Sequence, residues 1–289
     1  MPAFETNSPL RYPGGKAVLS DFLAATIEAN GMEDCTYVEP FAGGAGAAIN
    51  LLLAGSVSRI VLNDADRSVW SFWRAILDHT EEFVRLIHDT PVTVDEWRRQ
   101  RGIYQAQGAG VVPLGFAAFF LNRCNRSGIL TNGSVIGGLD QTGKWKIDAR
   151  YYKAALIRRI EGIAARRNRI LVHRLDAIEF LRGHIVSKRE RSRFFIYLDP
   201  PYFVKGSRLY LNYYDPEDHA RLAGFLRRLR NVRWLVTYDN VPEIHALYAW
   251  RPATNFSLHY SAATSREGSE IVIPSEGLAL PIERLLAAG

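Results

Sequence analysis

Hydrophobic positions along the chain form short runs that alternate with longer amphipathic stretches. Runs rich in β-branched or aromatic residues predict strands at Thr36–Glu39, Arg59–Leu62, Ile170–His173, Phe194–Leu198 and Trp234–Thr237. Between them lie helical stretches such as Ala45–Ala54 and Glu217–Leu229. This alternation is typical of a parallel sheet covered by helices on both faces. We therefore expect an α/β fold with a doubly wound, Rossmann-like sheet, and a final hairpin formed by Asn255–Tyr260 and Glu270–Ile273.

Residues from about Asp66 to Tyr152 interrupt this alternation. The pattern there predicts helices at Val69–Leu77, Val94–Gln105 and Leu114–Asn122, followed by a glycine-rich segment with turn dipeptides such as Asn132-Gly133. Such dipeptides are hairpin signals. We expect a sheet domain made of residues 1–65 and 153–289, and an insertion at 66–152 that consists of helices plus a β-hairpin at 127–146.

The charge of the chain is distributed unevenly. The net charge is +6, but residues 98–193 hold 20 Lys and Arg against 6 Asp and Glu, whereas residues 1–97 hold 6 against 14. A basic block next to an acidic one is typical of a segment that binds a polyanion. A solvated, arginine-rich helical face is the alternative interpretation.

Composition excludes several classes of protein. Hydrophobic residues make up 47% and charged residues 23% of the chain, which excludes a disordered or fibrous protein. No apolar run approaches the roughly 18 residues that span a bilayer, and the N-terminal segment does not resemble a signal peptide. The two cysteines, Cys35 and Cys124, lie far apart, and the histidines show no ligand spacing. We expect a cytoplasmic protein without membrane contact, disulfide or metal.

A glycine-rich turn follows the first predicted strand. Residues 37–46 read as a strand, a glycine turn at Gly43-Gly44 and the start of a helix, and Asp64 closes the next strand 21 positions after Gly43. An acid at about this spacing binds ribose hydroxyls in nucleotide-binding doubly wound folds. The motif is neither a Walker loop nor a clean GxGxxG. It predicts a nucleotide-type cofactor, and a turn that only packs helix on strand is the alternative.

A second motif, Asp199-Pro200-Pro201-Tyr202, directly follows the predicted strand Phe194–Leu198. Two prolines cannot continue a β-ladder, so they form a rigid corner at the strand end where open α/β sheets bind ligands. The Asp199 carboxylate and the Pro200 carbonyl can accept the two hydrogens of an amino group, and Tyr202 can stack on a planar ring. A corner with a purely structural role would not require these flanking residues.

The motifs occur in an order that resembles the α group of the Dam-like family of S-adenosylmethionine-dependent DNA adenine-N6 methyltransferases. The matching stretches are Leu10–Lys16, Tyr37–Gly46, Leu121–Arg123 with Ser127-Gly128, and Asp199–Tyr202. Weaker matches are Asp176, Tyr238–Asn240 and Gly268–Glu270. The segment after Arg123 departs from the Dam pattern, so the target sequence stays open.

The resemblance implies roles for individual residues. It implies catalytic roles for Asp199, Pro200 and Tyr202. It implies that the cofactor pocket contains Tyr12, Lys16, Glu39, Phe41, Gly43, Asp64, Asp176 and Asp199, and that DNA is contacted by Asn122, Arg123, Arg126, Asn132, Lys144 and Lys146. Lys16 would meet the methionine carboxylate, or be a surface lysine. Asp176 would accept from the cofactor's adenine, or cap a helix. Asn122 would contact DNA, or hold its own loop.

The activity implied by the resemblance is site-specific transfer of a methyl group to the N6 of a flipped-out adenine in duplex DNA. The cofactor would be S-adenosylmethionine, the product S-adenosylhomocysteine, and no metal would be required. We expect a monomeric, cytoplasmic enzyme of bacterial or phage type, with double-stranded DNA as partner; a companion restriction endonuclease is an open partner. Two alternatives remain: transfer to another amino group, on cytosine N4, RNA or protein glutamine, and a catalytically silent DNA-binding protein.

Overall fold

The computed structural model describes residues 7–11, 16–106, 108–203, 214–260 and 266–287. Tyr12, one of the predicted cofactor residues, lies outside these ranges. Within the described part of the chain, no helix is long and apolar enough to cross a bilayer.

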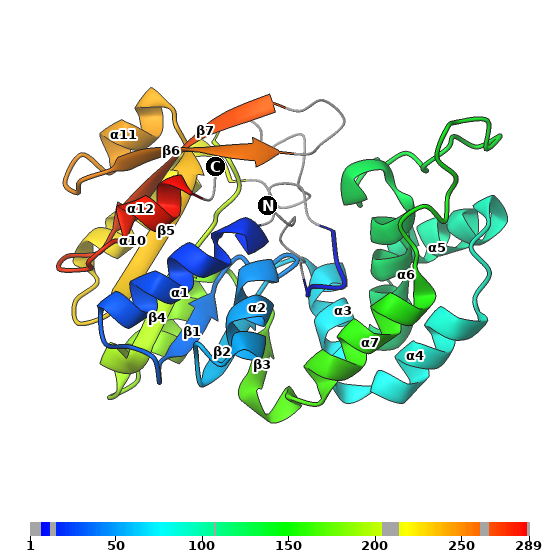
Figure 1. The fold of residues 1–289 in the computed structure, drawn as a ribbon, viewed down its shortest axis with the longest axis horizontal. Helices are drawn as coiled ribbons and strands as arrows, with labels where there is room; N and C mark the ends of the chain where they lie inside the picture. The colour runs from blue at the N-terminus through cyan, green and yellow to red at the C-terminus, as the bar shows by residue number, and fades with distance from the viewer. Residues whose placement is uncertain (1–6, 12–15, 107, 204–213, 261–265, 288–289) are drawn as a thin grey trace.

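A seven-stranded sheet forms the centre of the larger domain (Figure 1). Its order is β3-β2-β1-β4-β5-β7-β6, in which β7 pairs antiparallel with both neighbours and the remaining pairs are parallel. The strands are β1 (Thr36–Glu39), β2 (Arg59–Asn63), β3 (Ile170–His173), β4 (Phe194–Leu198), β5 (Arg233–Asp239), β6 (Thr254–Tyr260) and β7 (Arg266–Pro274). The predicted strands and final hairpin are confirmed. Because the order reverses between β1 and β4, the carboxyl ends of these strands flank the position where such sheets bind ligands.

Helices cover both faces of the sheet, as a doubly wound fold requires. Alternate strand residues point to opposite faces, so Tyr37 joins one apolar core and Val38 the other. The first core is covered by α1 (Ser20–Ala29) and α2 (Gly46–Ala54), the second by α8 (Ala177–Phe180), α10 (Pro216–Arg228) and α11 (Pro242–Leu247). The short helix α12 (Ile282–Leu286) packs against α1. The predicted Rossmann-like α/β architecture is confirmed.

The helices of the insertion form a lobe beside the sheet (Figure 1), and its apolar residues belong to the same core as Tyr37 and Ile60. It contains α3 (Arg67–Asp78), α4 (Thr80–Asp89), α5 (Val94–Ala106) and α6 (Val111–Cys124), and α7 (Lys153–Ala164) packs on α3 and α4. Helices α3 and α6 approach closely at Gly115, where an added Cβ would lie 2.6 Å from the carbonyl oxygen of Ser71. Stacked and edge-on phenylalanines fill the lobe's interior.

The expected hairpin at 127–146 is not formed by paired strands. After the 3-10 turn η2 (Arg126–Gly128), the structure shows turns and one isolated bridge, between Asn125 and Val135. The turn signals were correct, since Asn132 and Gly137 both have positive φ. Polar side chains bond the backbone here instead: Gln141 donates to the carbonyls of Ile136 and Gly138. Such local bonds compete with a β-ladder.

Candidate functional site

The Asp-Pro-Pro-Tyr corner lies at the carboxyl end of β4, beside β5. Leu198 pairs with Val236, so Thr237 on β5 reaches the first residue after β4. Its hydroxyl donates to Asp199 Oδ1 at 3.1 Å and in turn lies 2.9 Å from the hydroxyl of Tyr197. The carboxylate is therefore oriented by two neighbouring strands before any ligand arrives.

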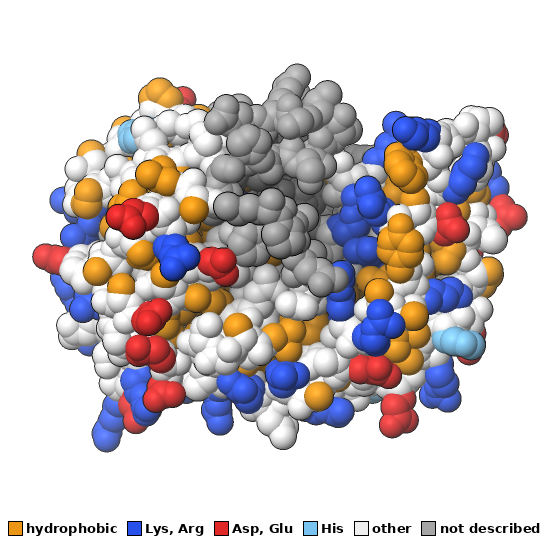
Figure 2. Space-filling view, in the orientation of Figure 1, with side chains coloured by type: hydrophobic (Ala, Val, Ile, Leu, Met, Phe, Trp, Pro, Cys, Tyr) orange, Lys and Arg blue, Asp and Glu red, His pale blue; other side chains and the backbone are white. Residues whose placement is uncertain are grey.

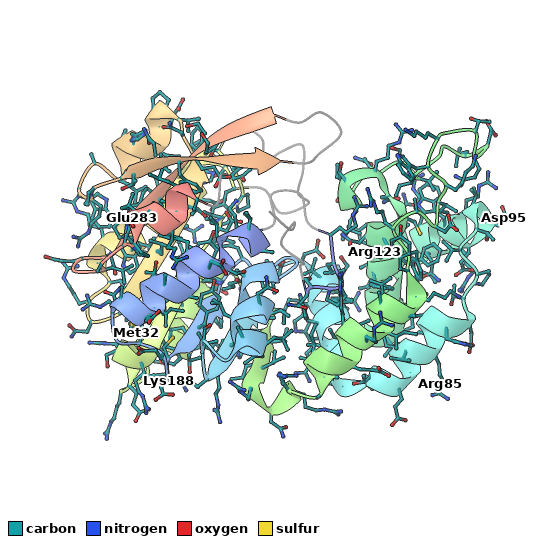
Figure 3. The ribbon with its side chains drawn as sticks, viewed as in Figure 1. Met32, Arg85, Asp95, Arg123, Lys188 and Glu283 are labelled. Atoms are coloured by element: carbon teal, nitrogen blue, oxygen red, sulfur yellow. The ribbon has the colours of Figure 1, made fainter. Side chains whose placement is uncertain are left out.

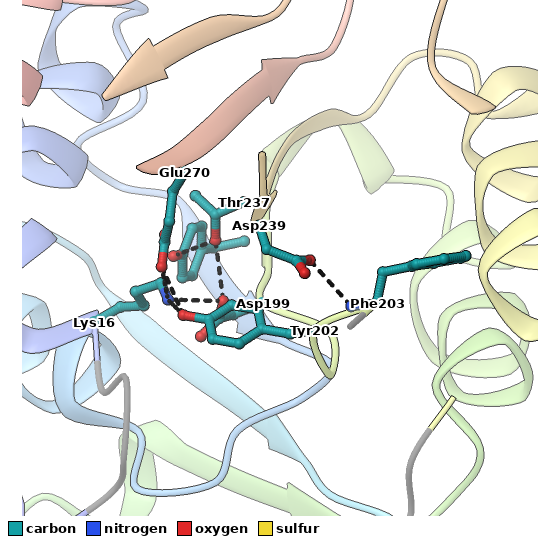
Figure 4. Close-up of polar contacts among 8 residues, drawn as sticks. Lys16, Asp199, Tyr202, Phe203, Thr237, Asp239 and Glu270 are labelled. Atoms are coloured by element: carbon teal, nitrogen blue, oxygen red, sulfur yellow. Dashed lines mark hydrogen bonds and ion pairs between the residues drawn. The ribbon is translucent and has the colours of Figure 1, made fainter. Parts of the chain in front are cut away.

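A buried lysine joins the corner to two other parts of the chain (Figure 4). Lys16, in the 3-10 turn η1 (Lys16–Leu19), places Nζ 3.2 Å from Asp199 Oδ1 and 3.3 Å from Glu270 Oε1 on β7. The ammonium also donates to the Tyr202 hydroxyl at 3.0 Å, and that hydroxyl donates to Glu270 Oε1 at 2.6 Å. We call Lys16, Asp199, Tyr202 and Glu270 the Lys16 cluster.

Burial sets the electrostatics of this cluster. Desolvation raises the pKa of Asp199 and the pKa of Glu270, while the nearby Lys16 ammonium opposes both shifts. Despite its own burial, Lys16 has a pKa well above the usual value because two carboxylates surround it. The cluster therefore holds two acids and one base in a low-dielectric environment.

The backbone after the corner is fixed from β5. Asp239 Oδ1 accepts from the Phe203 amide at 3.0 Å, as Figure 4 shows. The Phe203 ring packs against buried His219, whose Nδ1 lies 2.9 Å from the Tyr238 hydroxyl. These contacts hold the segment that carries Tyr202 against the sheet.

The glycine turn after β1 is held by Asp64. Gly43 has φ +46°, and its amide donates to Asp64 Oδ2 at 2.7 Å. The Asp66 amide donates to Asp64 Oδ1 at 2.9 Å, and the Gly43 carbonyl accepts from Trp73 Nε1. Burial and the charge of Asp66 raise the pKa of Asp64 to about 7.

Glu39, at the end of β1, is buried between the sheet and α2. Its Oε1 accepts from the Tyr37 hydroxyl and from the Ala48 amide, both at 3.1 Å. Burial raises the pKa of Glu39 to about 8. Phe41 is half-buried and lies edge-on to Tyr214, with ring centroids 5.4 Å apart.

The donors and acceptors beside the glycine turn fit a nucleoside-type cofactor. Asp64 is half-buried, and each of its carboxylate oxygens keeps acceptor capacity after its one backbone bond. The glycines leave backbone accessible, and Phe41 supplies an apolar ring. These residues fit the ribose and adenine parts of S-adenosylmethionine.

Two predicted cofactor residues have other partners in this structure. Lys16 pairs with Asp199 and Glu270, so its charge is already held by carboxylates. Asp176 caps α8 by accepting from the amides of Ile178 and Glu179. For Asp176 the geometry therefore matches the capping alternative.

Two predicted DNA contacts are buried in the insertion. Asn122 is fully buried and bonds the Arg11 backbone through both amide atoms, while Nδ2 also donates to the Gly128 carbonyl. Arg123, labelled on α6 in Figure 3, is 7% exposed and donates to the carbonyls of Arg150 and Pro9. Burial lowers the pKa of Arg123 to about 9. These side chains connect the N-terminal segment to the insertion, which corrects their expected role at a DNA surface.

The remaining predicted DNA contacts are exposed. They are Arg126, Asn132, Lys144 and Lys146, with Trp145 between the lysines 63% exposed. Lys146 Nζ donates to the Gln141 carbonyl, and Lys144 lies over the Trp145 ring. Figure 2 shows Lys and Arg side chains gathered on the insertion lobe along its side nearer the sheet domain. Such a surface suits phosphate contacts.

Glu270 lies in one of the weaker motif matches, and no site role was predicted for Thr237 or Tyr197. Their signal is topological, because β5 and β7 lie beside β4 only in the folded sheet. Among the residues described, no group of three His, Cys, Asp or Glu side chains is placed to hold a metal ion.

Comparisons with solved structures give weak likenesses. Sp1610 of Streptococcus pneumoniae has a TM-score of 0.39 at 8% identity, with 92% of this chain and 72% of that one covered. The SAM-dependent methyltransferase of Agrobacterium tumefaciens has a TM-score of 0.39 at 12% identity (90% and 61% covered). The rRNA methyltransferase aviRa of Streptomyces viridochromogenes has a TM-score of 0.34 at 13% identity, with 92% of this chain and 86% of that one covered. Likenesses this low support no assignment of function.

A comparison with curated proteins gives no match. A family model does match: residues 12–105 fit the D12 class of N6 adenine-specific DNA methyltransferases. The matched segment contains most of the first predicted cofactor motif, the glycine turn, Asp64 and the start of the insertion. These residues make up about a third of the chain, and over them the predicted resemblance to the Dam-like family is confirmed, in agreement with S-adenosylmethionine as the expected cofactor.

Proposed function

We propose that the chain transfers a methyl group from S-adenosylmethionine to the exocyclic N6 of an adenine flipped out of duplex DNA. One observation supports this most directly: in the described part of the chain, both partners of the Asp199 carboxylate reach Oδ1, which leaves Oδ2 for a ligand. The Pro200 carbonyl and the Tyr202 ring follow on the same rigid corner. An amino group on a planar ring is the ligand that these groups suit.

For methyl transfer, the Asp-Pro-Pro-Tyr corner must position the exocyclic N6 nitrogen, which is a weak nucleophile. When bound, S-adenosylmethionine supplies an electrophilic methyl group whose bond to sulfur breaks, with its electron pair, as the bond to N6 forms. Asp199 Oδ2 and the Pro200 carbonyl would accept the two N6 hydrogens and orient the nitrogen lone pair, which is otherwise delocalised into the ring. As positive charge develops on N6, the carboxylate stabilises it and accepts the departing proton or passes it to water.

The insertion would supply the DNA contacts. Exposed Arg126, Lys144 and Lys146 would meet phosphates, and Asn132 at its turn would approach base edges. The target base must leave the stack to reach Asp199, and stacking on Tyr202 would offset part of the cost of flipping.

Methyl transfer to nucleic acids tests this function. The protein is incubated with radiolabelled S-adenosylmethionine and either duplex DNA or RNA, and the digested nucleosides are separated. We expect label in N6-methyladenine from DNA. Label in N4-methylcytosine, in RNA or in protein glutamine would replace the proposal with transfer to another amino group, and no label in any acceptor would favour a silent DNA-binding protein. Sequencing of modified bases in cells that express the chain then gives the target site.

A further inference from the structure

Glu270 brings a second carboxylate into the Lys16 cluster from a distant part of the sequence. It lies on β7, is 2% exposed, and shares the Lys16 ammonium almost equally with Asp199, at 3.3 Å against 3.2 Å. Its Oε1 accepts both from Lys16 and from Tyr202. Strand pairing holds it there, because Glu270 is opposite Asp239 on β5.

The other carboxylate oxygen of Glu270 is unused. Oε2 is buried and has no hydrogen-bond partner in the structure as described. A buried acceptor without a donor is costly and rare in proteins. An acceptor left in this position, next to an ammonium that already contacts Oε1, can receive that ammonium without movement of the backbone.

Lys16 and the target amine compete for the same carboxylate. While the ammonium contacts Asp199 Oδ1, it offsets the cost of burying that charge. During transfer, positive charge grows on the amine held at Oδ2, and an ammonium kept at the same carboxylate would oppose it by like-charge repulsion. The reaction therefore requires the ammonium to move away from Asp199.

We propose that Glu270 is a positioning residue that receives the Lys16 ammonium when the target amino group enters at Asp199. In the unliganded protein Lys16 bridges the two acids; with the target bound it rests on Glu270, and Asp199 faces the amine with its full charge. Glu270 also holds the Tyr202 hydroxyl, so the base-stacking ring stays in place during the exchange. This inference rests on the proposed function.

The pH dependence of the reaction reports this exchange. Among the residues that the structure describes, the titratable groups facing Asp199 are Lys16 from η1, Glu270 from β7, Tyr202 from the corner and Tyr197 from β4, while Tyr37 and Glu39 approach from β1. Of these, Lys16 and Glu270 carry opposite charges next to Asp199. Removing each of them must shift the titration of Asp199 in opposite directions.

Glu270→Gln is the principal variant, because it keeps an acceptor at Oε1 and removes the charge. Lys16 then stays on Asp199, so the acidic limb of the kcat profile moves to lower pH. Because Lys16 then lacks a second anion, we expect kcat to fall roughly 10- to 100-fold. This is the size of effect that the loss of one charge-assisted hydrogen bond produces. Affinity for S-adenosylmethionine, measured by calorimetry, stays within twofold. Lys16→Met moves the acidic limb to higher pH.

A double-mutant cycle separates positioning from a general structural role. If Glu270 acts through Lys16, Glu270→Gln has little further effect in the Lys16→Met background. The matched control is Glu276→Gln, the same charge removal at an exposed residue near the start of β5, which leaves the profile unchanged. Additive losses, or an acidic limb that Glu270→Gln leaves in place or raises, would overturn the proposal.

A measurement that does not need catalysis separates the proposed role of Glu270 from the proposed methyl transfer. Absence of methyl transfer by the parent protein would overturn the proposed function. The charge coupling is measured in the unliganded protein by carboxyl-carbon NMR, where Glu270→Gln must lower the pKa of Asp199 and Lys16→Met must raise it. Thermal melting of each variant confirms folding, and for a Gln variant that does not fold, Lys16→Met alone carries the test. If Asp199 titrated in Lys16→Met as in the parent, the cluster would not be coupled.

Discussion

The Lys16 cluster and the turn-rich loop of the insertion use charge in opposite ways. In the cluster, Lys16, Asp199 and Glu270 are held side chain to side chain, largely away from water. In the loop, Lys146 bonds a backbone carbonyl, and Arg126 and Lys144 extend into solvent. Buried charges interact strongly and are oriented in advance, whereas exposed charges are screened within about 10 Å at 0.1 M salt. The first arrangement suits chemistry on one atom, the second adaptable contact with a polyanion.

The insertion also contains both kinds of cation next to each other. Arg123 lies in the last turn of α6 and is buried, whereas Arg126 is exposed only three positions later. The helix end explains the difference, since Asn125 leaves helical geometry and its buried side chain bonds Trp97 and Ile129. Proximity in the sequence therefore does not make these two arginines equivalent.

The largest effect is expected where charge is buried and faces the proposed substrate. Asp199→Asn keeps the shape of the side chain but removes the charge that would stabilise N6, so we expect methyl transfer to fall at least 1,000-fold, about 4 kcal/mol of lost electrostatic stabilisation. Calorimetry should show nearly unchanged binding of S-adenosylmethionine, because Asp199 is proposed to meet the target amine. A variant that lost the cofactor yet kept residual transfer would reverse this assignment.

A smaller effect is expected from the exposed cations. Arg126→Ala and Lys144→Ala should each lower the slope of log affinity against log salt by about one, because each lost phosphate contact releases fewer counterions. Arg123→Ala serves as the matched control: it removes the same charge, but its guanidinium bonds carbonyls, so the slope should stay unchanged. If the Arg123 and Arg126 variants changed the slope of log affinity against log salt equally, the buried and the exposed arginine would not differ in their contact with DNA.

The same variants, together with Asn132→Ala, locate the base reader. Loss of a residue that reads a base edge should relax the choice of one base pair by about 1–3 kcal/mol, measured as methylation across a library of duplex sites. If Arg126, Asn132 and Lys144 variants all kept the parent's preference, recognition would have to be sought in α5 or in other parts of the chain.

The fold was largely predictable because its signal is local. Short apolar runs bounded by turn residues identify buried strands, and the bounds of β1, β3 and β4 agree with the prediction. The predicted hairpin at 127–146 was wrong because turn dipeptides also occur in loops whose polar side chains bond the backbone amides and carbonyls. Gln141 does so with the Ile136 carbonyl and the Ile147 amide. Glycine signals the turn, but it does not determine what the flanking residues pair with.

The candidate site was predictable only in part, for a related reason. The Asp-Pro-Pro-Tyr corner and the glycine turn are contiguous motifs, so the chemistry is visible in the sequence. The contacts within the Lys16 cluster are not, because Lys16 and Glu270 are 254 positions apart and meet only in the folded chain. Burial of Arg123 and Asn122 depends equally on the N-terminal segment reaching the insertion.

An effect on cofactor binding is expected at Asp64, which accepts from two backbone amides and is half-buried. Its pKa of about 7 means that it loses its charge, and part of its acceptor capacity, as pH falls from 8 to 6. If the carboxylate accepts ribose hydroxyls, the Kd for S-adenosylmethionine should rise over this range by at most roughly tenfold per pH unit below the pKa. Calorimetry at each pH measures this.

Two substitutions test whether Asp64 is the group whose titration controls cofactor binding. Asp64→Asn should weaken binding by about 1–3 kcal/mol and remove the pH dependence, since the amide does not titrate. Asp66→Asn keeps a capping side chain for α3, because Asn caps as well as Asp, but it removes the like charge beside Asp64. The pKa of Asp64 should then fall, and the weakening of cofactor binding should begin at lower pH. If Asp66→Asn left the pH dependence in place, the titrating group would not be Asp64, and the turn after β1 would have only a structural role.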